Sequence, residues 1–437
     1  MSKSFYNLEK IPKNWKVSRL KYILSFSEEK SKNIVNENYL SLSKRGIILK
    51  DISLNEGQIA EDYSDYILTK KGQISMNPMD LLTGWVDISN FDGLISPAYY
   101  TFNVNKNFDT SFINYFLQSN YYRKTFFKLG KGVASHDNYG RWVITPDELK
   151  NIYIFFPNLS EQKVISQYLN MKTSQLDKLV EKTQNKINLL EIKKKVLIDQ
   201  CVNKGLNSKI ELRDSGIKWI GKVPKHWKVG SFKYYIDILT DYTANGSFKS
   251  LAENVEYLSR GFSRLVRLTD LRKDLQNDGI YVSEKSHKFL KKSELFGDEI
   301  LIANVGAYTG FALKMPINKG VCTLGPNMYL IRNNKRNSNL DYLVYLLNAK
   351  STQQGLDLLI SSTAQPKINK DNLKSLNVPF PPKSEQDDIA KFLNEKLKLV
   401  DNLILKEKSI IKKFIEYRKS IISLGVIGDI SVSNRMI

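Results

Sequence analysis

One long stretch of the chain, residues 160–206, carries positions at alternating gaps of four and three that are apolar except at Thr183 and Lys194. Because these gaps sum to seven, the repeat of a coiled coil, the pattern predicts a long helix with one apolar face. The apolar positions of this seam are Leu176, Val180, Ile187, Leu190 and Leu197. The stretch has no Pro, and no Gly before Gly205, so roughly 40 residues can form a rod about 60 Å long.

The same pattern returns later in the chain, at an offset of 224. The tripeptide Ser-Glu-Gln that opens the first stretch at residues 160–162 recurs at residues 384–386. The matching seam positions all remain apolar and are Val400, Ile404, Ile411, Phe414 and Ile421. Two charged positions also match, Lys194 with Arg418 and Asp177 with Asp401. We predict that the two helices pack on each other, the alternative being that each packs on its own globular domain.

The stretches that precede the helices are also related. Residues 11–17 read Ile-Pro-Lys-Asn-Trp-Lys-Val, and residues 223–229 read Val-Pro-Lys-His-Trp-Lys-Val, at an offset of 212. Since the helices are offset by 224, the second copy has gained 12 residues net between its start and its helix. The chain is therefore an internal tandem duplication of one unit. We expect Trp15 and Trp227 to pack the start of each copy onto its core.

Between these landmarks the pattern changes to short alternating stretches broken by turns, which is typical of β-strands. In the first copy we expect strands at residues 46–50, 72–75, 84–88, 98–104 and 151–156 and an amphipathic helix at residues 111–129. In the second copy we expect strands at residues 266–268, 299–303, 321–323, 328–331 and 376–380 and a helix at residues 340–359. The closing segments of the two copies align at offset 224, whereas the middle regions align poorly. This is expected of two domains that share one scaffold and recognise different targets.

These patterns divide the chain into four segments. We expect a globular domain at residues 1–158, a central long helix at 159–212, a second globular domain at 213–382 and a distal long helix at 383–437. The predicted fold class is α+β, with two mostly-β domains that also carry helices, joined by the two long helices.

The net charge of the chain indicates what class of partner it binds. The chain of 437 residues has 66 Lys and Arg against 45 Asp and Glu, a formal charge of +21. This excess favours a polyanionic partner, nucleic acid first and an anionic membrane surface second, although coding bias towards Lys, Asn and Ile can account for part of it. No run approaches about 18 uncharged apolar residues, so we expect no membrane span. The N-terminus does not resemble a secretory signal, and two cysteines fit a reducing cytosol, so we expect a cytoplasmic protein.

Candidate catalytic motifs are weak. Residues 77–80, Asn-Pro-Met-Asp, lack the second Pro and the aromatic residue of the Asn-Pro-Pro-aromatic motif of amino-methyltransferases. Residues 130–132, Gly-Lys-Gly, lack the spacing of a phosphate loop, and the Glu-Leu-Lys triplet at 148–150 is common by chance in a Lys-rich chain. The three histidines and two cysteines have no metal-ligand spacing. We expect no catalytic site, no metal and no cofactor in this chain.

Two similar but diverged domains held by a helical rod would form a two-point reader of DNA, with the rod setting the separation of the half-sites. The order Pro-x-x-Trp, variable domain, Phe-Pro-x-x-Ser-Glu-Gln and long helix, present twice, resembles the specificity subunit of type I restriction–modification systems. The matching residues are Pro12, Trp15, Pro157, Ser160, Glu161, Gln162 and Asp177, then Pro224, Trp227, Pro381, Ser384, Glu385, Gln386 and Asp401. Residues 214–221 and 364–368 also resemble the family, and the resemblance covers nearly the full chain.

This resemblance implies that each globular domain is a target-recognition domain for one half of a split double-stranded DNA sequence. It also implies that the two helices form an antiparallel coiled coil, which sets the half-site spacing and docks two modification (methyltransferase) subunits. Those subunits would use S-adenosylmethionine to methylate adenine N6, and two restriction subunits would add ATP-driven translocation and cleavage. The chain itself would be non-catalytic. Two other interpretations stay open: a fused endonuclease or methyltransferase, and a stand-alone or orphan DNA-binding regulator.

Basic and amide side chains near the predicted loops and early strands are the candidate DNA contacts, because Arg and Lys bind phosphate or guanine and Gln binds adenine. The candidates are Lys44, Arg45, Arg141, Arg260, Arg264, Arg267, Gln365 and Lys367. Arg141 matches Gln365 at offset 224, in the loop before each final strand, although residues 139–142 depart from the family motif. For each candidate the alternative is a plain solvated charge.

Overall fold

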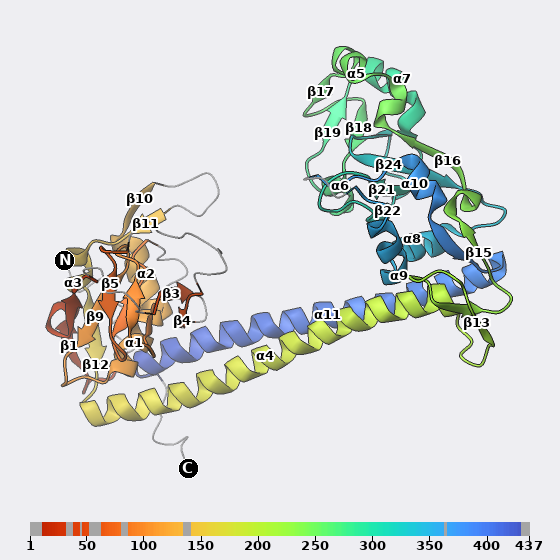
Figure 1. Cartoon of the computed structure of the whole chain (residues 1–437). Helices are drawn as coiled ribbons and strands as arrows, with labels where there is room; N and C mark the ends of the chain where they lie inside the picture. The colour runs from red at the N-terminus through yellow and green to blue at the C-terminus, as the bar shows by residue number, and fades with distance from the viewer. Residues whose placement is uncertain are drawn as a thin grey trace. The chain divides into compact units, whose positions relative to one another are not determined.

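The computed structural model describes residues 11–31, 38–43, 46–51, 63–79, 86–133, 141–361 and 365–429. It divides into two compact units (Figure 1). The first unit comprises Met1–Gln184 and Glu407–Ile437, and the second comprises Asn185–Lys406. Each unit therefore combines one globular domain with part of both long helices, α4 (Leu159–Lys204) and α11 (Lys383–Val426).

In the first unit, the first and last strands of the domain pair with each other: β1 (Lys16–Arg19) runs antiparallel to β12 (Tyr153–Phe156). An antiparallel four-stranded sheet follows the order β2 (Leu24–Ser27), β9 (Tyr100–Val104), β6 (Ile74–Met76), β7 (Val86–Ile88). Three further strand pairs are β3 (Leu40–Ser43) with β4 (Gly46–Leu49), β5 (Ile67–Thr69) with β8 (Gly93–Ile95), and β10 (Lys131–Val133) with β11 (Arg141–Val143). The short helices of the domain are α1 (Thr110–Gln118), α2 (Asn120–Leu129) and α3 (Pro146–Lys150).

The second unit repeats this frame. Strand β15 (Lys228–Ser231) pairs with β25 (Asn377–Phe380), and a four-stranded sheet has the order β16 (Ile236–Asp241), β24 (Met328–Asn333), β21 (Ile300–Ala303), β22 (Ala312–Lys314). A five-stranded sheet has the order β17 (Tyr257–Leu258), β19 (Ile280–Val282), β18 (Ser263–Val266), β23 (Cys322–Leu324), β20 (Glu294–Leu295), and a hairpin joins β13 (Leu212–Asp214) to β14 (Lys222–Pro224). The helices of the domain are α5 (Phe248–Asn254), α6 (Leu268–Leu271), α7 (Glu284–Phe289), α8 (Leu340–Asn348), α9 (Lys350–Asp357) and α10 (Lys370–Ser375).

The long helices complete the core of each unit. In the first unit, Leu169 of α4 and Ile421 of α11 are buried in the same cluster as Phe112 and Trp15. In the second unit, Val202 of α4 and other apolar residues of both helices join the domain core. All ten predicted seam positions are buried or half-buried. The predicted fold class, two α+β domains with an antiparallel pair of long helices, is confirmed.

Three sequence expectations were wrong. The helix expected at residues 111–129 is two helices, because Ser119 has an extended backbone (φ −68°, ψ 153°) and caps both. Its hydroxyl donates to the carbonyl of Phe116 at 2.7 Å and accepts from the amide of Tyr122 at 3.2 Å. The second copy breaks at Ala349 (φ −65°, ψ 144°), so its expected helix is also two. The strand expected at residues 266–268 ends at Val266, because α6 begins at Leu268.

Among the described residues, no helix combines the length and the apolar character that a membrane crossing would require.

Candidate nucleic-acid interface

In the first unit, the start of α4 is bonded to the domain by side chains of the Ser-Glu-Gln tripeptide. Gln162 is buried; its Oε1 accepts from the amide of Asp109 at 3.0 Å, and its Nε2 donates to the carbonyl of Pro157 at 2.9 Å. The indole of Trp15 donates to Glu161 at 3.3 Å. These bonds tie the first turn of the long helix to α1, to the end of the last strand and to the beginning of the domain.

The second unit repeats the same bonds at the start of α11. Oε1 of the buried Gln386 accepts from the amide of Asn339 at 2.9 Å, and its Nε2 donates to the carbonyl of Pro381 at 3.0 Å. The indole of Trp227 donates to Glu385 at 3.0 Å. We call each of these sets the domain–helix joint. Sequence comparison had marked the motif but predicted only core packing for the tryptophans.

Each joint also includes the end of the other long helix. In the second unit, α4 is followed by Gly205 at φ +74°, and a Cβ there would lie 3.3 Å from the ring of Trp227. In the first unit, Gly428 follows α11 at φ +78°, and a Cβ there would lie 3.1 Å from the ring of Trp15. Positive φ favours glycine at a helix end. Each tryptophan therefore touches the beginning of one long helix and the end of the other.

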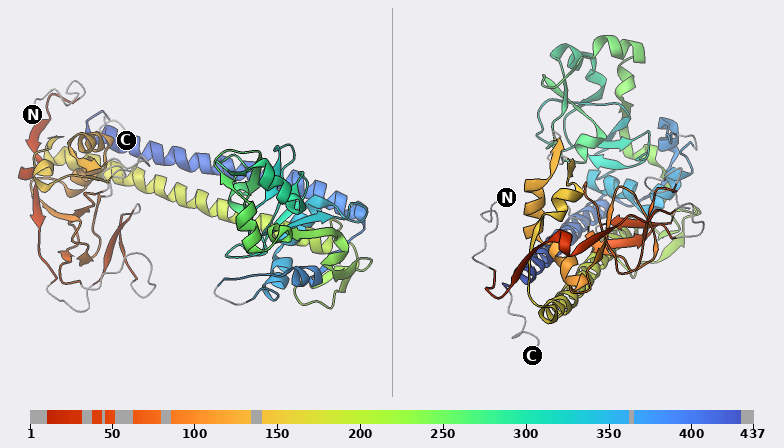
Figure 2. Two further views of the ribbon diagram at one scale, coloured as in Figure 1. Left: turned by 90° about the horizontal axis from the view of Figure 1, so that it is seen from above. Right: turned by 90° about the vertical axis from the view of Figure 1, so that its left-hand side faces the viewer.

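Ion pairs show how the long helices face each other. In the first unit, Asp177 of α4 lies 3.2 Å from Arg418 of α11. In the second unit, Lys194 of α4 lies 2.5 Å from Asp401 of α11. Later positions on α4 thus face earlier positions on α11, so the pair is antiparallel (Figures 1 and 2). At an offset of 224, Asp177 corresponds to Asp401 and Lys194 corresponds to Arg418. The two ion pairs are therefore equivalent, with the roles of α4 and α11 exchanged.

Reversing one of these charges should lower the free energy of unfolding slightly, and reversing its partner as well should restore most of the loss. Lys194→Asp would place an acid against Asp401 and lower the free energy of unfolding by roughly 1 kcal/mol or less, because both side chains are partly exposed. The double variant, with Asp401→Lys as well, should recover most of that loss. Urea unfolding of the purified chain measures both. A double variant as unstable as the sum of the single variants would contradict this pairing.

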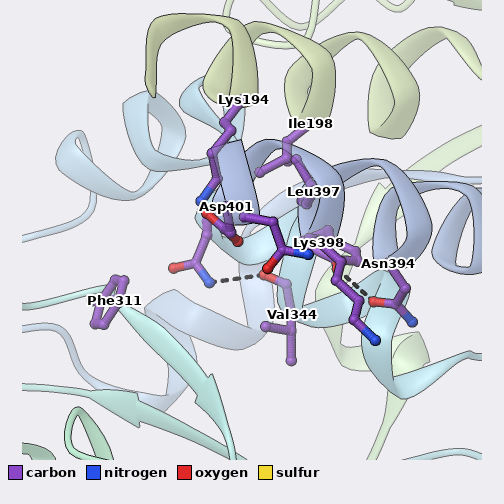
Figure 3. A pocket seen from close by; sticks show the side chains of 11 residues that line it. Lys194, Ile198, Phe311, Val344, Asn394, Leu397, Lys398 and Asp401 are labelled. Carbon is purple, nitrogen blue, oxygen red and sulfur yellow. Dashed lines mark hydrogen bonds and ion pairs between the residues drawn. The ribbon is translucent and has the colours of Figure 1, made fainter. Parts of the chain in front are cut away.

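A crevice of about 490 Å³ opens in the second unit beside this ion pair (Figure 3). Lys194 of α4 and Lys398 of α11 extend into it, and Phe311 and Val344 of the domain line it. No group of three or more His, Cys, Asp or Glu side chains suited to a metal ion occurs among the described residues. The crevice therefore marks where the domain rests on the helices, and its lining does not suggest a catalytic centre.

The first domain carries three of the predicted DNA contacts. Lys44 and Arg45 lie outside the described residues, and so does the side chain of Arg141, whose backbone begins β11. The strands before and after Lys44 and Arg45 form the β3–β4 pair, which packs on β7. Asp87 of β7 fills the space that a Cβ on Gly46 would need.

The carboxylate of Asp87 is buried among polar partners. Its Oδ1 accepts from Nδ2 of Asn114 at 3.1 Å and from the amide of Ile88 at 2.9 Å. Burial raises its pKa, and these bonds and the charge of Arg418 oppose that rise only in part. Asp87 therefore links the β3–β4 pair to α1 within the first unit.

In the second domain, two predicted contacts have their donors directed inwards. Nη1 of Arg264 donates to the carbonyl of Leu275 at 2.7 Å, and its Nη2 donates to that of Asn277 at 2.9 Å. Arg267 donates to both oxygens of the buried Asp270, at 2.9 and 3.0 Å. Burial alone would raise the pKa of Asp270, but the bonds from Arg267 and Asn277 outweigh it and lower that pKa. These bonds organise the turn after α6, a role the sequence did not reveal.

The remaining predicted contacts are exposed. Arg260 lies in the turn between β17 and β18. Gln365 and Lys367 lie in a segment paired with a loop that sequence reasoning had missed. The amide of Gly306 donates to the carbonyl of Pro366 at 2.9 Å. We call residues 304–310 and 365–368 the paired loops.

The paired loops are held together at several points. Val305 and Lys367 form an isolated antiparallel bridge. The hydroxyl of Thr309 donates to the carbonyl of Pro366 at 3.0 Å, and the amide of Ile368 donates to the carbonyl of Asn304 at 3.1 Å. Exposed polar side chains are thus presented on a backbone that is fixed from two sides.

The geometry agrees with comparison to known proteins. The family model described as "Type I restriction modification DNA specificity domain" matches residues 12–191 and 225–413. This chain belongs to that family. The two matched ranges coincide with the two copies found in the sequence, so the family predicted from the duplicated motifs is confirmed.

Individual relatives support the same membership. The type I restriction enzyme MjaVIII specificity subunit of Methanocaldococcus jannaschii is 25% identical over 452 residues, covering 97% of this chain and 95% of that protein. A match at 27% identity to a MjaX specificity subunit of the same organism covers 66% of this chain and 62% of that protein. The StySPI specificity subunit of Salmonella potsdam is 20% identical over 98% of this chain and 92% of its own length.

Solved structures show the same fold. A chain from a study of complex assembly and conformational transition in the type I R-M system has a TM-score of 0.69 at 13% identity, over 96% of this chain and 99% of that one. The HsdS subunit from Thermoanaerobacter tengcongensis has a TM-score of 0.50 at 14% identity, over 96% and 98%. Both solved chains therefore share the fold of this chain.

Proposed function

We propose that this chain is the non-catalytic subunit that gives a type I restriction–modification complex its sequence specificity. Each domain reads one half of a bipartite, asymmetric DNA target, and the bases between the halves are not read. The observation that carries this proposal is the repeated domain–helix joint, which holds two diverged domains to one antiparallel helix pair in the same way. Two recognition domains that are each held on the same helix pair would bind half-sites at a fixed separation, which supports a spacer of fixed length.

We further propose that the helix pair docks two modification subunits, which methylate adenine N6, and that two restriction subunits join the full complex. Exposed apolar side chains on both long helices in the second unit support docking on the helices. These side chains are those of Leu189, Ile192 and Val196 of α4 and Leu399 and Leu403 of α11. Since exposed apolar patches mark protein interfaces, a partner helix is a suitable occupant. Both cysteines are free and buried, which supports a cytoplasmic location.

Single contacts provide a test within each half-site. We expect Arg141→Ala to weaken or relax recognition of the half-site read by the first domain only, and Gln365→Ala to do so for the second only. Loss of one base contact should reduce discrimination roughly 10-fold to 100-fold. Methylation rates on duplexes mutated in either half measure this. Equal rates for both variants and the wild-type chain on every duplex would remove Arg141 and Gln365 from the interface.

Reconstitution of the complex from purified subunits tests whether methyl transfer belongs to the modification subunit and sequence specificity to this chain. The purified chain alone should transfer no methyl group from S-adenosylmethionine to DNA, and the chain with its modification subunit should methylate adenine at specific sites. Methyl transfer by the chain alone would instead support a fused enzyme. If no modification subunit co-purifies with the chain, although DNA binding is specific, the chain is a stand-alone DNA-binding regulator.

A further inference from the structure

An arginine lies over the ring of a tyrosine that belongs to the paired loops. The guanidinium carbon of Arg272 lies 4.5 Å from the ring centroid of Tyr308. Tyr308 is 48% exposed, and Arg272 is also exposed. A guanidinium stacked on an aromatic face is restrained in orientation while its N–H edges point outwards in the ring-parallel plane. The pair therefore presents an exposed guanidinium held over an aromatic ring at the surface of the second domain.

The position of Tyr308 is fixed by the paired loops. Gly306 has φ +92°, a conformation that favours glycine, and its amide is bonded to Pro366. Thr309 donates to the carbonyls of both Gly306 and Pro366, at 2.7 and 3.0 Å. The tyrosine is thus held between two tethered residues, next to the segment that carries Gln365. No atom lies within 4 Å of the place where a Cβ on Gly306 would be, so a DNA backbone can approach closely there.

The position of Arg272 is fixed from the other side. It directly follows α6, whose buried Asp270 is bonded to Arg267 and to Asn277. The amide of Arg272 donates to the carbonyl of Leu268 at 3.0 Å. The backbone on both sides of this contact is therefore fixed before DNA arrives, so little backbone freedom is lost on binding.

We propose that Arg272 is a specificity-determining residue that reads a guanine in the half-site of the second domain, with Tyr308 as its positioning residue. This inference rests on the proposed function. Guanine presents two acceptors, O6 and N7, in the major groove, and they match two parallel donors of a guanidinium. The neighbouring Lys367 and Gln365 supply phosphate and adenine contacts of the same surface. Neither Arg272 nor Tyr308 was among the residues singled out from the sequence.

The test uses the complete modification complex and a set of duplexes in which every base pair of both half-sites is changed in turn. The wild-type complex should discriminate roughly 10-fold to 100-fold in favour of guanine at one position of the second half-site. Arg272→Ala and Arg272→Lys should both lose that discrimination, because a lysine keeps the charge but lacks the fork. Discrimination at the other positions should be unchanged.

Tyrosine variants separate positioning from folding. Tyr308→Phe keeps the aromatic ring and should retain the preference for guanine, whereas Tyr308→Ala should weaken it. Arg336→Ala, which removes an exposed arginine of the same domain in the turn after β24, is the matched control and should behave as wild type.

Two results would overturn the assignment. One is unchanged discrimination at every position in Arg272→Ala; the other is an equal loss across all duplexes, which would show a phosphate contact that reads no base. Both leave a split methylated sequence and hence the proposed function intact. A wild-type complex that methylates no split sequence would overturn the proposed function itself.

Discussion

Exchange of residues 17–157 for the matching segment of another family member is expected to change one half of the methylated sequence completely and leave the other half as it was. The segment lies between Trp15 and Glu161, so both partners of this bond of the joint remain after the exchange. Gln162 also remains, and it bonds to backbone groups rather than to variable side chains of the domain. A grafted domain should therefore be held on the helices as the original domain is.

The reciprocal exchange is the control for this prediction. Replacing residues 229–381, the matching segment of the second copy, should change the other half of the methylated sequence. Methylation mapping in cells that express each chimera with the modification subunit measures both. A chimera in which both halves change, or neither half changes although the protein is folded, would show that the two domains do not read the target independently.

Removal of a single side-chain amide from the second domain–helix joint should destabilise the chain strongly. Gln386→Ala leaves the amide of Asn339 and the carbonyls of Pro381 and Asn337 without their partner. Gln386 has no exposed surface and its bond to Pro381 is buried, so water does not replace that bond. An unpaired buried group costs about 1–3 kcal/mol, and the two part-buried bonds add to this loss, so the free energy of unfolding should fall by roughly 2–4 kcal/mol.

Urea unfolding of the purified chain measures this loss, with Asp388→Ala as the control because Asp388 is an exposed residue on the same turn of α11. Gln162→Ala should cause a similar loss in the first unit. A looser second joint should also let the complex methylate targets whose spacer is one base pair longer or shorter. A stability for Gln386→Ala within about 0.5 kcal/mol of the control would contradict the role of the joint.

The sequence revealed the duplication because the residues of the joint are held by interior bonds that differ little between the copies. Trp15 and Trp227, with Gln162 and Gln386, recur at fixed offsets, and the heptad seams recur with them. These signals come from local spacing, so they predicted the long helices and the order of the domains. They did not predict the break at Ser119, because a capping serine inside an amphipathic stretch is compatible with a continuous helix.

The proposed recognition surface was harder to predict because it depends on contacts between distant segments. Arg264 and Arg267 have the same residue type as Arg272, and only the structure shows that their donors are directed to groups of their own domain. Loop 304–310 carries no charged residue, so it gave no signal until its bonds to Pro366 placed Tyr308 beside Arg272. The net charge of the chain therefore predicted a nucleic-acid partner, but it did not identify the residues that would contact DNA.

The most direct test of the central claim is adenine methylation mapping in cells that carry this chain with its modification subunit, compared with cells that lack only this chain. We expect one bipartite, asymmetric sequence with an unread spacer of fixed length, methylated only when the chain is present. If the same adenines are methylated with and without the chain, the chain does not supply the specificity of the complex.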